Sequence, residues 1–349
     1  MTVRNVIFSL MLAFFFNTSH AGSVISVYYF PGWEGSEAWG KLDAYKLRTP
    51  LIGQYYDNSV PVIKKQMQEM SDYGIDVVFF DWYWNGGHLA LQGPINNFAN
   101  IARSSNVKFS VMLANHESLP TSLDDFDLMV NYWLLNYFNS GNYFKIDGKP
   151  VVVIFSPENL QFSANKFSFT TRDLFSRANL LAKTRGFPGI YFVAVSHAVS
   201  MWVNVSLRQY GYSAVTGYNY HFALSGEYDA NSPPKAAHSY RELMKDYNTT
   251  WTWFRDNSEL PYWPSVISGW DRRPWGGSAD PKHDNCASTP EEFLQHIRSL
   301  KKLIDTSNSN KFGRVVTICC WNEFGEGSYI EPTVGTGFSY LSSIKKVFH

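Results

Sequence analysis

Eight short runs of apolar, β-branched and aromatic residues recur along this chain, and helix-like patterns separate most of them. Continuous apolar runs of this kind are typical of parallel strands that are covered on both faces. Eight such strands with intervening helices, in a chain of 349 residues, predict an α/β fold, namely a single-domain (β/α)8 TIM barrel. The predicted strands are 24–30, 76–80, 108–113, 151–155, 190–195, 214–218, 262–267 and 315–320.

Several segments between these strands carry the residues that usually begin and end helices. Apolar residues from 60 to 73 follow helical spacing, and Gly74 supplies a stop signal. Ser122 is a predicted N-cap, and Thr289 and Glu292 form a predicted capping box. An open, doubly wound sheet is the main alternative fold. The barrel is favoured because no glycine-rich phosphate loop follows the first predicted strand.

The first residues are predicted to be an export signal and not part of the fold. Arg4 supplies positive charge, residues 6–16 form a short apolar segment, and residues 19–21 fit a small-x-small cleavage site. This pattern predicts a signal peptide over 1–21 and export to the periplasm or secretion. Residues 22–349 are expected to form the barrel domain, and the protein is expected to be a monomer. An uncleaved anchor is the alternative. No other apolar run approaches the roughly 20 residues of a membrane span, so none is expected after cleavage.

Charge and aromatic content narrow the possible partners. Lys plus Arg and Asp plus Glu both number 30, so nothing indicates the basic surface of a nucleic-acid-binding protein. The 12 Trp and 21 Tyr residues suit an oligo- or polysaccharide, whose C–H faces stack on flat rings. No metal-ligand motif is present, so we expect neither a metal nor another cofactor. Cys319 and Cys320 are not expected to be joined, because neighbours in an extended strand point to opposite faces.

Nearly every predicted strand ends in aromatic and polar residues. A (β/α)8 barrel carries its active site at the C-terminal ends of its strands, so we expect these residues to line a sugar-binding cleft. Asp81 could instead cap a turn, His116 could be a structural histidine, and Asp271 could form an ordinary ion pair. The predicted substrate-binding residues are Tyr29, Trp33, Asp81, Trp82, Tyr83, Asn115, His116, Tyr218, Tyr220, Trp270, Asp271, Trp321, Asn322 and Glu331.

The last predicted strand is followed by the stretch WNEFGEG, residues 321–327, which places two carboxylates three residues apart. Paired carboxylates at the opening of a barrel are the catalytic groups of many glycosidases. Gly325 and Gly327 allow a sharp turn that brings both side chains into one cavity. Glu323 and Glu326 are therefore the predicted catalytic residues. A surface turn with two solvated acids is the alternative interpretation.

The longer segment WNEFGEGSYIEPT resembles the signature of the glycoside hydrolase family 99-like and WbsX-like proteins. The resemblance implies a (β/α)8 barrel that hydrolyses α-mannosidic linkages within a chain, with retention of configuration. It also implies that Glu323 is a base acting on the sugar's own 2-hydroxyl group and that Glu326 is the acid protonating the leaving oxygen. Further matches, in the same order along nearly the whole mature chain, are Tyr28-Tyr29, Phe80-Asp81-Trp82-Tyr83, Lys149-Pro150-Val151 and Gly269-Trp270-Asp271.

The chain departs from the family pattern around these motifs. Phe324 stands where Trp is typical, and Gly325 stands where the endomannosidases commonly have His. After the third predicted strand, only Asn115 aligns with the WbsX-like pattern A-N-E-N-W. Two other functions stay open beside the hydrolase. One is a glycosyltransferase of polysaccharide assembly, which the export signal disfavours; the other is a non-catalytic carbohydrate-binding barrel, which two crowded acids disfavour.

Overall fold

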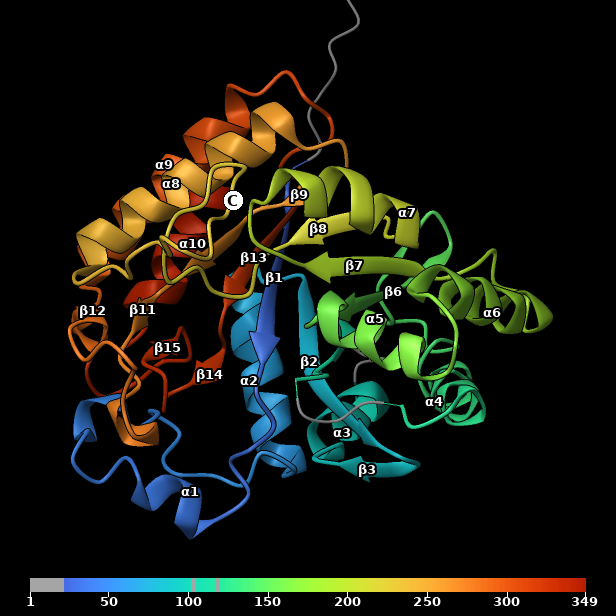
Figure 1. Ribbon diagram of the computed structural model, residues 1–349. Helices are drawn as coiled ribbons and strands as arrows, with labels where there is room; N and C mark the ends of the chain where they lie inside the picture. The colour runs from blue at the N-terminus through green and yellow to red at the C-terminus, as the bar shows by residue number, and fades with distance from the viewer. Residues whose placement is uncertain (1–21, 102–104, 117–119) are drawn as a thin grey trace, which may run out of the picture.

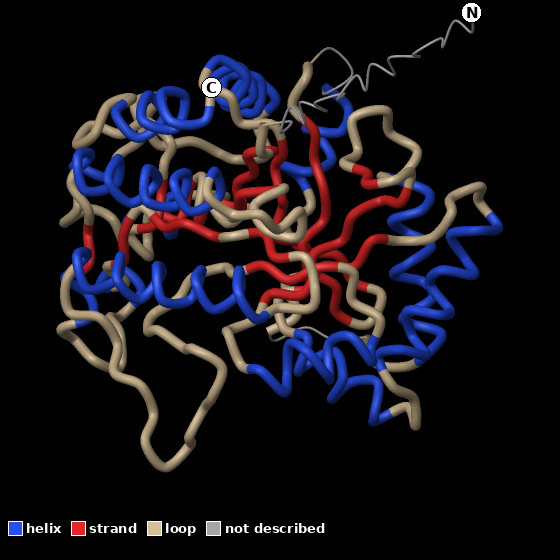
Figure 2. Tube along the Cα trace, turned by 90° about the horizontal axis from the view of Figure 1, so that it is seen from above, coloured by secondary structure: helices blue, strands red, loops and turns tan. Residues whose placement is uncertain are grey.

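Parallel strands form a barrel at the centre of the protein, and helices surround it (Figure 1). The computed structural model describes residues 22–101, 105–116 and 120–349. Seen from above, the strands converge in the middle and the helices lie around them (Figure 2). The predicted (β/α)8 barrel in a single domain is confirmed. Its strands are β1 (Val24–Tyr29), β2 (Val77–Asn85), β4 (Lys108–Leu113), β6 (Lys149–Ile154), β7 (Tyr191–Val195), β8 (Ala214–Thr216), β9 (Tyr262–Trp263), β10 (Ser265–Ile267) and β13 (Val315–Cys319).

The barrel closes through the segment that the sequence predicts as one strand over 262–267. Pro264 divides this segment into β9 and β10, because proline has no N–H group for a strand ladder. β9 pairs with β8, whereas β10 pairs with β13, so the two halves join the ends of the sheet. The strand order is β10-β13-β1-β2-β4-β6-β7-β8-β9, and all of these neighbours are parallel.

Predicted caps mark where several of the surrounding helices begin. The Ser122 side chain accepts a hydrogen bond from the N–H of Asp125 at the start of α4, and Thr289 and Glu292 form the capping box of α9. The helices are α1 (Ser36–Gly40), α2 (Val60–Asp72), α3 (Gly93–Ile101), α4 (Leu123–Asn136), α5 (Pro157–Lys166), α6 (Thr171–Thr184), α7 (Arg208–Tyr210), α8 (Tyr240–Asn257), α9 (Pro290–Asp305) and α10 (Ser339–Phe348). Short 3-10 helices are η1 (Lys46–Arg48), η4 (Arg273–Trp275) and η5 (His283–Asn285), and η3 (Trp202–Leu207) is a π-helix. Small additional strands are β3 (His88–Ala90), β5 (Lys145–Ile146), β11 (Gly269–Trp270), β12 (Cys286–Ala287), β14 (Asn322–Glu323) and β15 (Ser328–Tyr329).

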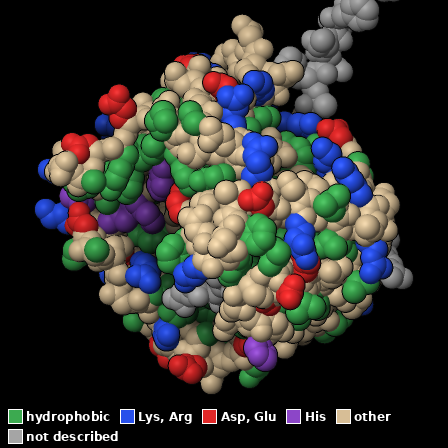
Figure 3. All heavy atoms as spheres, turned by 45° about the vertical axis from the view of Figure 1, so that its right-hand side comes forward, with side chains coloured by type: hydrophobic (Ala, Val, Ile, Leu, Met, Phe, Trp, Pro, Cys, Tyr) green, Lys and Arg blue, Asp and Glu red, His purple; other side chains and the backbone are tan. Residues whose placement is uncertain are grey.

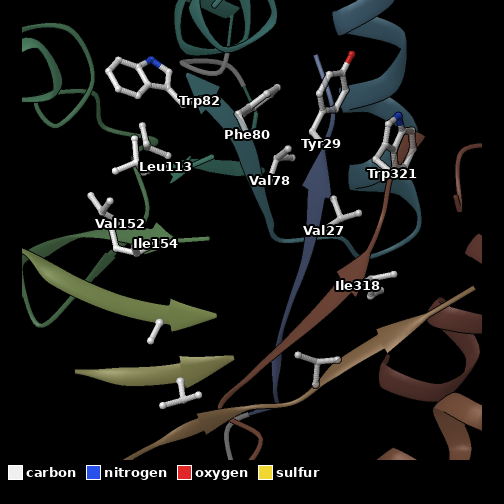
Figure 4. Packing of buried hydrophobic residues seen from close by; sticks show 14 of the residues in the cluster. Val27, Tyr29, Val78, Phe80, Trp82, Leu113, Val152, Ile154, Ile318 and Trp321 are labelled. Atoms are coloured by element: carbon white, nitrogen blue, oxygen red, sulfur yellow. The ribbon is translucent and has the colours of Figure 1, made fainter. Parts of the chain in front are cut away.

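Side chains along each strand alternate between two hydrophobic layers. Tyr28 and Phe79 belong to the inner layer, where they pack with Trp263 inside the barrel. The next residues on the same strands, Tyr29 and Phe80, belong to the outer layer between the strands and the helices (Figure 4). Burying one such aromatic side chain contributes about 1.5–3 kcal/mol. This alternation decides which residues near a strand end can reach the opening of the barrel.

The expectation for Cys319 and Cys320 is wrong, because the structure joins them in a disulfide. The peptide bond between them is cis, and their Cα atoms lie only 3.0 Å apart. The disulfide joins the two side chains, which the sequence predicted to point to opposite faces. Cys286 is a free, buried thiol.

Two expectations concern export and membranes. The predicted signal peptide over 1–21 lies outside the described residues. Among the helices within the described ranges, none combines the length and the apolar character that crossing a membrane requires.

Candidate active site

Three carboxylic acids gather beyond the C-terminal ends of the barrel strands. Asp81 lies on β2, opposite Met112 near the end of β4, and Glu323 lies on β14 directly after β13. Glu326 occupies the turn between β14 and β15. The side chains of Asp81 and Glu323 are each only 6% exposed. This is the end of the barrel at which active sites form, so the position of the cluster agrees with the fold rule.

Burial and mutual repulsion make these acids hold their protons. Burial, followed by the charges of Glu326 and Asp81, raises the pKa of Glu323 well above its usual range. Burial and then Glu326 do the same to the pKa of Asp81. Burial raises the pKa of Glu326 to about 7, although the positive charge of Arg272 opposes the shift. The cluster therefore keeps protons at neutral pH, as general acid catalysis requires.

Some of the polar atoms of this cluster have no protein partner. Within the described part of the chain, Oδ1 of Asp81 and Oε2 of Glu326 are buried without a hydrogen bond. Buried polar atoms usually have partners, because an unmade hydrogen bond costs about 1–3 kcal/mol. Unpaired oxygens on adjacent acids are therefore available to a bound ligand or to water.

An aromatic wall connects the acids to neighbouring strand ends. The Tyr218 hydroxyl group donates a 3.4 Å hydrogen bond to Oε1 of Glu323. The Tyr218 ring packs on Tyr28, with 4.9 Å between ring centroids, and edge-on against Phe155 at 5.3 Å. The exposed His116 continues the wall between Phe155 and Tyr83. The structure thus brings together the predicted site residues Asp81, Tyr83, His116, Tyr218, Glu323 and Glu326 along one continuous surface.

The β14–β15 hairpin, which carries both glutamates, is hydrogen-bonded to segments far away in the sequence. The side-chain amide of Asn322 makes two 2.9 Å hydrogen bonds to the backbone of Phe30, and the N–H of Asp271 donates to the carbonyl oxygen of Glu326 at 2.6 Å. Gly327 has a φ of +70°, and a Cβ atom on Gly325 would overlap the ring of Trp275. The turn therefore needs glycine at 327 for its backbone conformation, as the sequence predicts, whereas glycine at 325 is needed because the Trp275 ring packs against it.

Arg48 is a supporting residue that sequence reasoning missed. Its guanidinium group is buried, forms an ion pair with Asp271, and donates to the carbonyl oxygen of Phe324 at 2.9 Å. Asp271 also accepts a bidentate interaction from Arg273. Asp271 and Asn322 therefore act in this structure as anchors of the hairpin. No local pattern around Arg48 signals this role, because its partners lie more than 200 residues away in the sequence.

Other predicted substrate-binding residues are occupied in packing instead of facing the acids. Trp82 belongs to the outer layer and packs on Trp84 and Trp133, because a strand turns successive side chains to opposite faces. Trp82 was expected to line the cleft, but the alternation turns its side chain toward the helices. The remaining residues of this kind are Tyr29, Tyr220 and Trp321 in the outer layer, Trp33 in a cluster with Trp39 and Phe324, Asn115 hydrogen-bonded to Ser156, and Glu331 hydrogen-bonded to Tyr55 and Gln66.

A cavity of about 640 Å³ lies next to the segment that is hydrogen-bonded to Glu326, because its lining residues Trp270 and Arg272 flank Asp271, whose N–H group donates to the carbonyl oxygen of Glu326. Its lining includes the predicted residue Trp270 and also Arg272, whose charge acts on both Glu323 and Glu326. Arg272 is not among the residues that the sequence predicts for the site. Across residues 22–101, 105–116 and 120–349, no group of three or more His, Cys, Asp or Glu side chains is placed to hold a metal ion.

Comparison with known proteins assigns the family. The sequence model of the family described as "Glycosyltransferase WbsX" matches residues 43–344. The chain belongs to the WbsX family. Two curated relatives from Xanthomonas campestris pv. campestris, each named "Uncharacterized protein WxcX", are 23% identical over 320 residues. The match covers 86% of this chain and 43% of each relative, so this WbsX-family chain spans less than half the length of those relatives.

Solved structures share the fold of this WbsX-family protein. The GH99 endo-α-mannosidase from Bacteroides thetaiotaomicron superimposes with a TM-score of 0.64 at 15% identity, covering 93% of this chain and 95% of that one. A structure called "Glycoside hydrolase-like protein" superimposes with a TM-score of 0.66 at 18% identity, covering 100% of this chain and 97% of that one. The family 1 β-glucosidase from Thermotoga maritima superimposes with a TM-score of 0.51 at 11% identity, covering 92% of this chain and 96% of that one. The fold is therefore that of glycoside-hydrolase barrels.

Proposed function

We propose that this protein is an exported glycoside hydrolase that cleaves α-linked glycans, namely α-mannosidic ones, with retention of configuration. The observation that carries the proposal is the buried cluster of Asp81, Glu323 and Glu326 at the C-terminal end of the barrel. A binding barrel gains nothing from neighbouring acids whose burial and repulsion cost stability, whereas acid–base chemistry needs them. The aromatic wall beside the cluster suits a sugar substrate.

In the proposed reaction, Glu323 is the base and Glu326 is the acid. Glu323 takes the proton of the sugar's 2-hydroxyl group while that oxygen attacks C1, and the bond from C1 to the leaving oxygen breaks. Glu326 gives its proton to the leaving oxygen. Glu326 then takes a proton from water as the water oxygen attacks C1 and opens the 1,2-anhydro ring, and Glu323 returns its proton to the 2-oxygen. The two inversions at C1 give net retention, and no covalent bond to the protein forms.

Neighbouring groups bear on these roles. The hydroxyl group of Tyr218 donates to Glu323 and partly opposes the rise in its pKa that burial and the charges of Glu326 and Asp81 cause. The base role of Glu323 therefore rests on the family motif and on the sharing of one proton between two neighbouring carboxylates. Glu326 has a pKa of about 7, raised by burial, so it is substantially protonated near neutral pH. Loss of that proton at higher pH removes the acid. We therefore expect kcat/KM to fall as the pH rises through about 7.

The test is product analysis with a panel of α-mannans and α-glucans, followed by kinetics of Glu326→Gln. NMR should show the α-anomer of the new reducing end before mutarotation. Glu326→Gln should lower kcat by roughly 10² to 10⁴ on natural substrates, the usual worth of acid catalysis. It should spare an aryl glycoside whose leaving group needs no proton. The exposed Glu227→Gln is the matched control. Equal slowing of both substrate types by Glu326→Gln would contradict the acid role.

A glycosyltransferase is the second candidate, because the description of the family names one. This function requires a nucleotide-sugar donor, and such enzymes often use a divalent cation to neutralise the departing diphosphate. Incubation with nucleotide sugars and acceptor glycans, with EDTA or with Mn²⁺, separates the two functions. Transfer that depends on Mn²⁺, in protein that stays folded under EDTA and hydrolyses no glycan, would replace the hydrolase proposal.

A further inference from the structure

Two histidines and a carbonyl group form a chain of hydrogen bonds at the wall of the cavity beside the acids. Nδ1 of His283 lies 2.6 Å from the carbonyl oxygen of Ala237, and Nε2 of His283 lies 2.9 Å from Nδ1 of His221. Both histidines line the cavity, and histidine side chains gather at a hollow on the surface shown in Figure 3. The proposed reaction uses neither of them.

The carbonyl group of Ala237 determines where the hydrogens of this chain are. A carbonyl oxygen only accepts, so Nδ1 of His283 must carry a hydrogen and donate it. Both rings are neutral near pH 7, because burial lowers the pKa of His283 and lowers that of His221 to about 3. Nε2 of neutral His283 then has a lone pair and accepts the hydrogen on Nδ1 of His221. A neutral imidazole has one hydrogen, so Nε2 of His221 carries a lone pair.

The surroundings of Nε2 of His221 indicate which kind of ligand this lone pair suits. Within the residues that the structure describes, Nε2 of His221 has no hydrogen-bond partner. Much of the surrounding wall is apolar, including Phe222, Pro233 and Trp270, whose ring centroid lies 4.3 Å from that of His221. Arg272, Ser278 and Asp280 also line the cavity, so hydrogen-bonding groups stand beside the apolar face. Such a lining selects a ligand that presents hydroxyl groups beside a C–H face. Sugars combine these two features.

We propose that this cavity binds one sugar residue of the glycan and that Nε2 of His221 accepts a hydrogen bond from a hydroxyl group of that residue. His283 is a positioning residue, because it acts only by fixing the tautomer of His221. Arg272 lines the cavity and is the neighbour of Asp271, whose N–H group donates to the carbonyl oxygen of Glu326 at 2.6 Å, so we expect the bound sugar to lie on the side of the acids. The proposal rests on the proposed function, because it takes the ligand to be a carbohydrate.

The first test reads the tautomers without any ligand. Long-range ¹H–¹⁵N spectra of the full chain, assigned with His221→Phe and His283→Leu, distinguish protonated from unprotonated ring nitrogens. Both residues should be neutral, with the hydrogen on Nδ1. A hydrogen on Nε2 of His221, or a charged ring at pH 7, would overturn the proposal.

The second test measures binding of α-mannobiose to the Glu326→Gln chain by calorimetry and by the ¹⁵N shift of His221. One neutral hydrogen bond corresponds to a loss of roughly 2- to 10-fold in affinity, so His221→Phe should weaken binding by that factor. His283→Leu should weaken it similarly, whereas His283→Gln should restore it, because its amide oxygen can accept from His221. The exposed His88→Gln is the control and should bind like the parent.

The outcomes separate the two proposals. Hydrolysis of glycans with no ¹⁵N shift at His221 and full binding by His221→Phe overturns the role of His221 and leaves the hydrolase standing. Binding that shifts His221 without hydrolysis by the wild-type chain overturns the hydrolase and retains the sugar site. Equal loss of binding in His283→Gln and His283→Leu overturns the positioning role.

Discussion

Glu331 is a buried acid behind the candidate active site, and its proton makes stability depend on pH. The side chain is 1% exposed. The hydroxyl group of Tyr55 lies 2.7 Å from one carboxyl oxygen, and the side-chain amide of Gln66 donates to the other at 3.0 Å. Burial nevertheless dominates these hydrogen bonds and raises the pKa of Glu331 from 4.5 to about 8. We expect Glu331→Gln, which mimics the protonated carboxyl group, to remove most of this dependence.

The direction of this pH dependence follows from how tightly Glu331 binds its proton in the folded and in the unfolded state. The folded state binds the proton of Glu331 more tightly than the unfolded chain, so the stabilisation is fully present below pH 4.5. It is lost progressively as the pH rises through about 8, where the folded state must give up the proton. At 1.36 kcal/mol for each pH unit between the two pKa values, the loss is at most about 5 kcal/mol. Glu331→Gln should therefore be more stable than wild type at pH 9, by several kcal/mol.

Urea denaturation followed by tryptophan fluorescence, at pH 5, 7 and 9, measures the effect. The free energy of unfolding of wild type should fall more steeply with pH than that of Glu331→Gln. Glu37→Gln changes an exposed acid and should follow the wild-type curve. Parallel curves for wild type and Glu331→Gln would refute the reasoning. A Glu331→Gln chain that keeps full stability at pH 9 but loses affinity for α-mannobiose would return Glu331 to the substrate-binding role that the sequence predicted.

Three further expectations follow from the packing and the covalent structure. Arg48→Met should lower the free energy of unfolding by about 3–5 kcal/mol, because it removes one partner of a buried ion pair, and a change below 1 kcal/mol in urea denaturation would contradict this. Trp82→Ala should cost about 3–5 kcal/mol in the same assay and leave the kcat/KM of folded protein near wild type; the reverse pattern would place Trp82 in the cleft. Thiol titration of denatured protein should find one thiol, Cys286, without reductant and three after reduction; three before reduction would contradict the disulfide between Cys319 and Cys320.

The sequence predicted the barrel because its signals are local. Apolar runs mark strands, and residues such as Ser122 and Thr289 cap helices through hydrogen bonds to N–H groups three residues away. The division of the seventh strand at Pro264 was missed, although the proline is visible in the sequence. The apolar run continues on both sides of it, and only the pairing of each half with a different neighbour reveals two strands.

The candidate site was predicted less completely, because adjacency in sequence is not adjacency in space. Asp81 and Trp82 were treated alike as strand-end residues, yet the pleat turns the first toward the acids and the second toward the helices. Glu323 and Glu326 come together with Tyr218 because separate strands end at the same edge of the barrel. The anchoring of their hairpin by Arg48 depends on a contact between segments far apart in the chain.

By itself, the sequence determined the order of strands and helices and the types of chemical group available at the strand ends, because both depend on near neighbours and on residue identity. The tertiary structure decided how those groups behave. The proton affinities of Glu323, Glu326 and Glu331 come from burial and from charges on other segments. The tautomer of His221 is set through His283 by the backbone of Ala237, which only folding brings within reach.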